Sequence, residues 1–379
     1  MREAYLDNSA TTPVCPQAAQ KILEMMTVNY GNPSSLHTKG IDAQNEIESA
    51  RRILADELHC RTDELFFTSG GTEANNMALF GTVEARKRVG NKIVVSAVSH
   101  SSVIESAAKL EKDGVEVAYI GTDGYGRLDA EAFANALDEK TVLASVEMVN
   151  NETGAVQPIE SIGRAIKRKK LSTALHIDAV QAFGKINVNP QKFGAQLLTV
   201  SAHKIFGPKG CGALYVQKGM RIIPRTFGGE QEKKMRPGTE SSPLIAGFGE
   251  AVRQLREDSG ASARISELRE RCILMLEKMD GITVNSPADA SPYVINFSVP
   301  GIRSETMLHH LASRGVFVSS GSACAKGHKS HVLEAMGLDR ARIDSAIRVS
   351  FGKQNTYEDV EQLLTALDEG MKTLTRAKY

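Results

Sequence analysis

The chain has 379 residues, of which 41% are hydrophobic and 24% are charged, and its formal net charge is +1 at pH 7. This balanced composition is typical of a globular protein and gives no reason to expect a nucleic acid or a membrane surface as a partner. The sequence holds neither an apolar run of the roughly 18 residues that a membrane helix needs nor a signal-peptide core. We therefore expect a cytoplasmic protein with one large domain and one smaller domain.

Helical and β-rich patterns alternate over the first two thirds of the chain. Residues 43–59 repeat apolar side chains at helical spacing. Short β-rich runs, separated by helical stretches, follow at 65–68, 93–98, 115–120, 142–146, 174–177 and 196–200. Strands that alternate with helices predict right-handed βαβ units and a mostly parallel sheet. The predicted fold class is α/β.

The pattern changes from about residue 258. An amphipathic helical pattern over 265–279 precedes β-rich runs at 293–299, 316–318 and 346–351, and a last helix begins at a capping box of Thr356 and Asp359. This mixture predicts a smaller α+β domain made of residues 258–379, joined by residues 1–13. The large domain is predicted to span 14–257.

Five cysteines are widely spaced along the chain: Cys15, Cys60, Cys211, Cys272 and Cys324. None forms a C-x-x-C pair, so the sequence predicts neither a metal site nor a disulfide framework. Cys324 differs from the others because it lies in a run of small residues beside Lys326. Such a loop is typically exposed, and a nearby cation favours the thiolate. A nucleophilic role and the ordinary role of a small buried hydrophobe both stay open for it.

The most informative strand ends at Ser201, His203 and Lys204, directly before a Gly/Pro-rich turn. Open α/β sheets hold their ligands at the carboxyl ends of their strands. A lysine that is partly desolvated there has a lowered pKa and can form a Schiff base. The plain alternative is a surface lysine at a strand end, since most lysines are exposed.

Other strand ends carry residues that suit the same chemistry. A lysine that holds pyridoxal phosphate needs a carboxylate opposite the ring nitrogen, and Asp178 closes a short strand. Gln181 is placed to donate to the ring oxygen. His100 follows a third strand and suits stacking or proton transfer, and Asn151 follows a fourth. A structural role is the alternative for Asp178 and for His100.

Two further features indicate anion binding. A Gly-rich turn at 69–71 joins a strand to a helix, which points backbone N–H groups at an anion. The turn matches neither the P-loop nor the dinucleotide fingerprint, and an ordinary capped turn stays equally open. The Gly207–Gly210 turn also has the wrong spacing for a P-loop. Arg348 lies inside a predicted strand, where burial needs an anion that a substrate carboxylate would supply.

A series of motifs runs in order over nearly the whole chain: YLDNSATTP at Tyr5, GNPSS at Gly31, FTSGGTEANN at Phe67, NNETGAVQ at Asn150, HIDAVQAFGK at His176, SAHKIFGPKG at Ser201, RPGTE at Arg236, SSGSACAKG at Ser319 and IRVSFG at Ile347. Each motif is weak alone, but together they closely resemble the NifS/IscS-type cysteine desulfurases. These are fold-type I pyridoxal-phosphate enzymes related to class V aminotransferases.

The resemblance implies a role for each candidate residue. Lys204 would hold pyridoxal 5'-phosphate, Asp178 would pair with the ring nitrogen, and His100 would stack on the ring and assist proton transfer. The other cofactor contacts would come from Gly71, Thr72, Asn151, Gln181, Ser201 and His203. Arg348 would hold the substrate carboxylate, and Asn151 would also contact the substrate. Thr239 would reach the phosphate of a neighbouring subunit, which implies a homodimer.

The implied activity converts L-cysteine into L-alanine and leaves a persulfide on Cys324. The sulfur would pass to a protein of iron–sulfur assembly or of tRNA or cofactor thiolation. The tether at 325–330 is shorter than in the longer-loop members of the group, which leaves the acceptor open. The alternatives are a selenocysteine lyase, another class V aminotransferase-type enzyme, and a non-enzymatic scaffold of iron–sulfur assembly.

Overall fold

The centre of the molecule is a seven-stranded sheet with the strand order β2-β8-β7-β6-β5-β3-β4. The computed structural model describes residues 2–257, 260–320 and 330–376. The strands are β2 (Leu65–Thr68), β3 (Lys92–Ser96), β4 (Glu116–Ile120), β5 (Thr141–Glu147), β6 (Ala174–Asp178), β7 (Leu197–Ser201) and β8 (Gly212–Val216). All neighbours pair in parallel except β8, which is antiparallel to β2 and to β7. The predicted α/β class with a mostly parallel sheet is confirmed, whereas β8 was not predicted.

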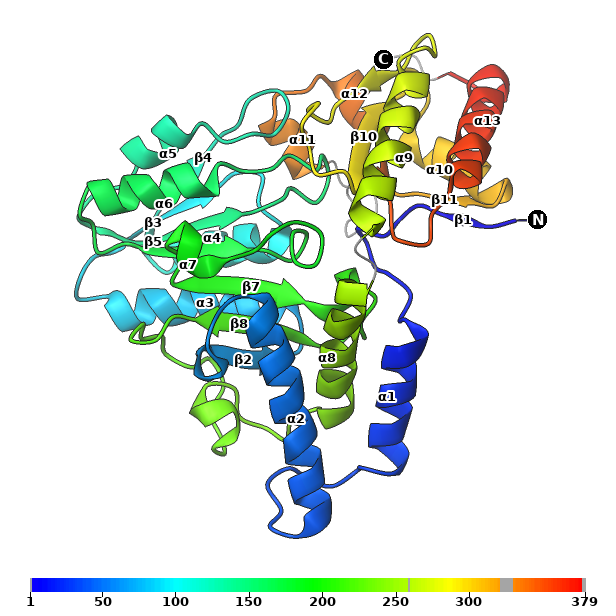
Figure 1. Cartoon of the computed structure of the whole chain (residues 1–379). Helices are drawn as coiled ribbons and strands as arrows, with labels where there is room; N and C mark the ends of the chain where they lie inside the picture. The colour runs from blue at the N-terminus through cyan, green and yellow to red at the C-terminus, as the bar shows by residue number, and fades with distance from the viewer. Residues whose placement is uncertain (1, 258–259, 321–329, 377–379) are drawn as a thin grey trace.

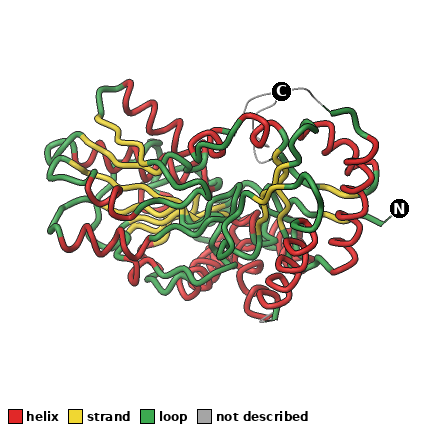
Figure 2. Tube along the Cα trace, turned by 90° about the horizontal axis from the view of Figure 1, so that it is seen from above, coloured by secondary structure: helices red, strands yellow, loops and turns green. Residues whose placement is uncertain are grey.

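Helices cover both faces of this sheet (Figures 1 and 2). Alternate residues of β3 show why: Val94 faces one apolar core, and Ile93 and Val95 face another. The helices of the large layer are α1 (Pro16–Thr27), α2 (Thr38–Glu57), α3 (Gly71–Arg86), α4 (Ser101–Lys112), α5 (Ala130–Asn135), α6 (Ile159–Arg168), α7 (Pro190–Phe193) and α8 (Ser242–Glu257). The core with Val94 includes residues of α2, α6 and α8, and the other core includes residues of α3 and α4. Both faces are buried, which explains the continuous apolar strands.

A third apolar cluster, the core of the smaller C-terminal part, gathers the C-terminal elements together with Ala4 and Leu6. Its strands are β9 (Thr283–Val284), β10 (Val294–Ser298) and β12 (Ala346–Ser350), while β1 (Ala4–Tyr5) pairs with β11 (Val316–Phe317). Its helices are α9 (Ala261–Leu276), α10 (Ser304–Ser313) and α13 (Tyr357–Thr373), and α11 (His331–Ala335) and α12 (Arg340–Asp344) lie beside it. Both termini lie on this side of the molecule (Figure 1). Separate cores support the division at 13/14 and 257/258, which stays a proposal.

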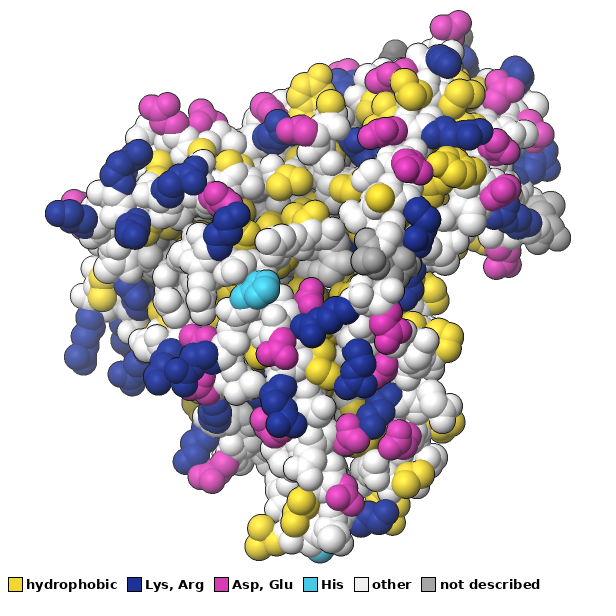
Figure 3. Space-filling model, in the orientation of Figure 1, with side chains coloured by type: hydrophobic (Ala, Val, Ile, Leu, Met, Phe, Trp, Pro, Cys, Tyr) yellow, Lys and Arg dark blue, Asp and Glu magenta, His cyan; other side chains and the backbone are white. Residues whose placement is uncertain are grey.

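The helix ends test the local predictions. The capping box at the start of α13 is confirmed, because the Asp359 carboxylate accepts from the backbone N–H of Thr356 at 3.0 Å. Helix α2 begins at Thr38, earlier than predicted, because the His37 side chain accepts from the N–H of Gly40. In the part of the chain that the structure describes, no helix is long and apolar enough to cross a membrane. Basic and acidic side chains are interspersed over the face seen in Figure 3.

Candidate active site

The carboxyl ends of β6 and β7 meet the first turn of α3. Asp178 ends β6 and pairs in register with Thr199 of β7, two residues before Ser201. Gly71 begins α3 and lies so close to both strands that a Cβ there would be 2.8 Å from Val180 and 3.9 Å from Ser201. The structure therefore brings together Gly71, Asp178 and Ser201.

One corner of this site is suited to a phosphate. The hydroxyl of Ser201 is buried and has no hydrogen-bond partner among the residues that the structure describes. The N-terminus of the 16-residue helix α3 lies beside it and presents free N–H groups with a positive dipole end. Thr72 is exposed in the first turn. Nearby, burial lowers the pKa of His203 to about 4, and Lys204 adds to this effect, so the imidazole is neutral at pH 7.

A line of hydrogen bonds connects Asp178 to His100. The Asn75 amide donates to the Asp178 carboxylate at 2.7 Å and to the Ser102 hydroxyl oxygen at 2.8 Å. That hydroxyl lies 2.9 Å from Nδ1 of His100, which also accepts from the Ser102 N–H at 3.2 Å. Because Nδ1 accepts, we assign the proton of the neutral ring to Nε2. Sequence reasoning missed Asn75, although it lies within the FTSGGTEANN motif.

The charge of His100 follows from its surroundings. Burial lowers its pKa below the ordinary value of 6.5, the negative charge of Asp178 acts in the opposite direction, and Lys204 and His331 lower it further. His100 is therefore mainly neutral at pH 7. A neutral imidazole can both accept and release a proton, as general acid–base work requires.

Lys204 and Gln181 converge on the N-terminal segment. Lys204 ends the short 3₁₀ helix η2 (Ala202–Lys204), and its Nζ donates to the carbonyls of Ser9 at 2.5 Å and Ala10 at 2.8 Å. The Gln181 amide donates to the same Ser9 carbonyl at 3.0 Å. The predicted cofactor lysine and ring-contacting glutamine are thus neighbours.

Arg348 is buried on β12, and its side chain is only 3% exposed. One Nη donates to the Asp7 carboxylate at 2.9 Å and the other to the Asn151 carbonyl at 3.1 Å. Its Nε has no partner within the described part of the chain. A buried guanidinium needs an anion, as the sequence indicated, but in this structure Asp7 supplies it. A substrate carboxylate must displace Asp7 or share Arg348 with it.

Cys324 lies outside the described residues, but the residues on both sides of the 321–329 segment are described. Ser319 exchanges backbone hydrogen bonds with Arg348 at 2.6 and 3.1 Å, and the Ser330 hydroxyl donates to the buried Glu152 at 2.6 Å. The arginine predicted for substrate binding is therefore directly connected to one flank of the loop.

The described cysteines are poor nucleophile candidates. Cys15, Cys211 and Cys272 are buried, and Cys60 is half-buried. Burial raises the pKa of Cys60 and of Cys272 to about 12, and it also raises the pKa of Cys211. Since the thiolate is the reactive form, the thiols of Cys60, Cys211 and Cys272 are unreactive near pH 7. Thr239 is exposed in the loop before α8.

Comparison with known proteins places this geometry in a family. The sequence profile described as aminotransferase class-V matches residues 4–363. The chain belongs to the aminotransferase class-V family. It is 38% identical over 388 residues to the cysteine desulfurase IscS of Methanosarcina thermophila, covering 100% of this chain and 96% of that protein. It is 39% identical to the putative cysteine desulfurase IscS 1 of Bacillus subtilis, and the match covers 99% of this chain and 100% of that protein.

Solved structures agree with the sequence relatives of this class-V chain. A NifS-like protein superposes with a TM-score of 0.93 at 35% identity, covering 98% of this chain and 100% of that one. A structure of SspA in complex with cysteine superposes with a TM-score of 0.83 at 32% identity, covering 93% and 100%. The predicted NifS/IscS-type membership is thereby confirmed.

Proposed function

We propose that this class-V enzyme is a pyridoxal-phosphate-dependent cysteine desulfurase, which converts L-cysteine into L-alanine and keeps the sulfur on Cys324. The observation that carries the proposal is the hydrogen-bonded line from Asp178 through Asn75 and Ser102 to His100, beside Lys204. An anion and a neutral acid–base group beside one lysine support this activity. The names of the relatives support the same activity.

The residues present fit the cofactor. The unpartnered Ser201 hydroxyl and the N-terminus of α3 suit its phosphate, with Thr72 and His203 as further ligands. Asp178 would hold the proton of the ring nitrogen, and Gln181 and Asn151 would contact the ring side. Bound to Lys204, pyridoxal phosphate supplies an electron sink for the substrate Cα.

The protein's own groups would then orient the substrate and move its proton. Arg348 would bind the L-cysteine carboxylate, because its unpaired Nε and its Nη groups form a planar fork that matches a carboxylate. His100 would stack above the reacting atoms and exchange a proton at Nε2. Lys204, released from the Ser9 and Ala10 carbonyls, would supply the amine that binds the cofactor.

The sulfur step would use the Cys324 thiolate. Its Sγ would form a bond to the substrate sulfur while the Cβ–S bond of the substrate breaks. The carbon skeleton would take up protons and leave as L-alanine, and the enzyme would keep a persulfide. No external oxidant is needed, because the electron pair of the broken Cβ–S bond stays with the carbon skeleton, which is reduced to the methyl group of L-alanine as the transferred sulfur is oxidised to the persulfide level.

The assembly and partners extend the proposal. A homodimer would let the exposed Thr239 reach the cofactor phosphate of the partner subunit. A sulfur-acceptor protein of iron–sulfur assembly or thiolation would take the persulfide sulfur. A cytoplasmic location stays a prediction from the sequence.

Lys204→Ala tests the proposal against Lys209→Ala, which removes an exposed lysine from the following turn. Wild type and Lys209→Ala should show the visible Schiff-base absorbance and release alanine from L-cysteine. Lys204→Ala should lose both. Alanine release at the wild-type rate by Lys204→Ala would contradict the proposal. Turnover of L-selenocysteine alone, or turnover that requires a keto acid, would instead establish a lyase or an aminotransferase.

A further inference from the structure

A cavity that Lys204 helps to line adjoins the candidate active site. Its volume is about 210 Å³. It is formed by the loop after β6, the end of α8, the start of α9 and the segment after β12, so both apolar cores contribute to it. Lys204 is shared with the candidate active site, but His100, Asp178 and Arg348 do not line the cavity. The cavity therefore meets the candidate active site at Lys204 and extends beyond it.

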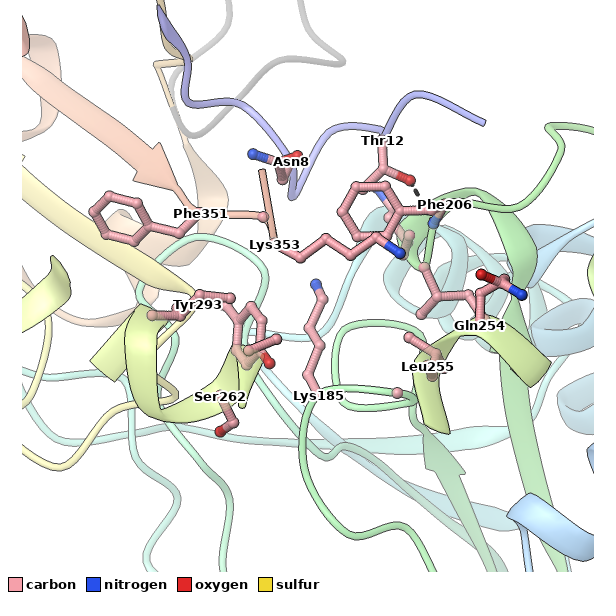
Figure 4. A pocket seen from close by; sticks show the side chains of 16 residues that line it. Asn8, Thr12, Lys185, Phe206, Gln254, Leu255, Ser262, Tyr293, Phe351 and Lys353 are labelled. Atoms are coloured by element: carbon pink, nitrogen blue, oxygen red, sulfur yellow. Dashed lines mark hydrogen bonds between the residues drawn. The ribbon is translucent and has the colours of Figure 1, made fainter. Parts of the chain in front are cut away.

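The cavity combines positive charge with an apolar wall. Lys185, Lys204 and Lys353 line it, and no Asp or Glu is among its described lining residues. Figure 4 shows the side chains of Lys185 and Lys353 directed into the same space. Leu255 and Ile265 contribute apolar surface. Lys185, Lys204 and Lys353 are all half-buried, and positive groups that share such a space repel one another, so an anion is the complementary ligand.

Lys185 shows how unfavourable this space is for an uncompensated charge. Burial lowers its pKa to about 7, and the positive charges of Lys204 and Arg348 contribute further. Burial is the largest cause, so the effect persists when Lys204 carries the cofactor. The Lys185 Nζ donates to Gln181 at 3.1 Å and lies 5.6 Å from the centre of the Tyr293 ring. An anion beside Lys185 would restore its charge.

We propose that this cavity is a binding site for a small organic anion, a carboxylate on a compact apolar body. The carboxylate would lie between Lys185 and Lys353, and the apolar body would pack against Leu255 and Ile265. The cavity has the volume of about seven water molecules, which limits the ligand to a short chain or a single ring. Inorganic anions would leave the apolar wall in contact with water.

The cavity is connected to the candidate active site by hydrogen bonds. Lys185 donates to Oε1 of Gln181, whose amide donates to the Ser9 carbonyl, which also accepts from Lys204. A ligand that draws Lys185 toward itself weakens its bond to Gln181. The visible absorbance of the cofactor should therefore change when the ligand binds. This consequence rests on the proposed function, whereas the binding site itself does not.

Calorimetric titration of the holoenzyme with hexanoate tests the site, with hexanamide as the uncharged probe. Hexanoate should bind wild type and Lys278→Met, which removes an exposed lysine. Lys185→Met and Lys353→Met should each weaken binding by about tenfold or more, because each removes a charged hydrogen-bond donor. Hexanamide should bind wild type at least about tenfold more weakly. Absent binding, equal binding of hexanamide, or unchanged affinity in both lysine variants would overturn the proposal.

The pH dependence provides a second test. Lys204, Arg348, Lys353 and His203 surround Lys185, and His203 stays neutral because its pKa is about 4. Binding should take up a proton at Lys185, so hexanoate should bind about tenfold more tightly at pH 6 than at pH 8. Lys185→Met should lose this difference, and equal wild-type affinity at both pH values would contradict the proposal. Calorimetry needs no turnover, so its outcome is independent of desulfurase activity.

Discussion

Asn75 holds the site together at the scale of single residues. Its amide donates to Asp178 and to Ser102, and through Ser102 it orients His100. All of this occurs in a buried environment, where an unpaired polar group is costly. A single amide therefore fixes both the proposed partner of the cofactor ring and the proposed proton carrier.

Asn75→Ala should consequently impair both folding and turnover. We expect the free energy of unfolding to fall by about 1–3 kcal/mol, because Asp178 and Ser102 each lose a donor. The kcat for alanine release should fall by about tenfold or more as His100 loses its orientation. Asn76→Ala is the matched control, since the Asn76 amide donates to the Thr72 carbonyl at the surface and not to Asp178 or Ser102 within the described part of the chain. Equal effects of the two substitutions on kcat would refute this role.

His100 determines the expected pH profile. Its pKa lies below 6.5 because burial outweighs the charge of Asp178, so the neutral form predominates at pH 7. The neutral form is lost as pH falls through this lowered pKa, and kcat/KM should decline only on the acid side of pH 6.5. His100→Gln should lower kcat/KM by about 100-fold and abolish this decline. A wild-type decline that begins above pH 7 would be inconsistent with a buried, neutral His100.

At the scale of elements, the segment between β1 and α1 connects the two cores. Asp7 pairs with Arg348 of β12, the Asn8 amide donates to the Ser350 carbonyl at 2.9 Å, and the Ser9 carbonyl accepts from Lys204. These contacts explain why a short N-terminal stretch packs with C-terminal elements. They also place Asp7 where a substrate carboxylate is expected.

Asp7→Ala should leave the buried Arg348 without its anion. We expect the free energy of unfolding to fall by about 3 kcal/mol, because removing one partner of a buried ion pair leaves the other charge buried without compensation. L-alanine should stabilise this variant more than wild type, since its carboxylate meets no competitor at Arg348. Asp42→Ala, at an exposed position of α2, should change neither quantity. Denaturant unfolding with and without L-alanine measures both the free energy of unfolding and its increase on ligand binding. If L-alanine stabilised Asp7→Ala and wild type equally, Asp7 and the substrate carboxylate would not compete for Arg348.

Helix α3 has to approach β6 and β7 closely, which Gly71 permits. A Cβ at this position would lie 2.8 Å from Val180, closer than packed atoms tolerate. Gly71→Ala should shift the start of α3, destabilise the fold by about 1–3 kcal/mol and weaken cofactor retention. Gly121→Ala meets no atom within 4 Å and serves as the control. The cofactor that remains after dialysis is measured by absorbance. If Gly71→Ala retained as much cofactor as Gly121→Ala, the proposed phosphate site beside Gly71 would be contradicted.

At the scale of the whole molecule, local sequence patterns predicted most strands of the seven-stranded sheet. The β-rich runs predicted the parallel strands, and the polar residues that end them identified Asp178 and Lys204. Strand β8 was missed because its short run follows directly on the turn after Lys204 and breaks the alternation with helices. The Asp7–Arg348 pair joins positions 341 residues apart and leaves no periodic signal. Asn75 was missed because its role depends on Asp178, 103 residues away.

The two cores meet around the candidate site, which explains the distribution of roles (Figure 1). The large layer supplies Lys204, Asp178 and His100, whereas β12 supplies Arg348. The loop that carries Cys324 follows β11, and its flanks contact both Arg348 and Glu152. The proposed reaction therefore requires groups from both cores around Lys204, together with the thiol of Cys324.

A single-turnover reaction with L-cysteine, in the absence of reductant, tests that requirement most directly. Wild type and Cys324→Ser should show the same cofactor absorbance, because Cys324 is not among the residues assigned to cofactor binding. The account predicts one alanine and one persulfide sulfur per wild-type active site, with the added sulfur located on Cys324 by mass spectrometry, and neither product from Cys324→Ser. Stoichiometric alanine release by Cys324→Ser would contradict the account and establish direct expulsion of sulfur from the substrate.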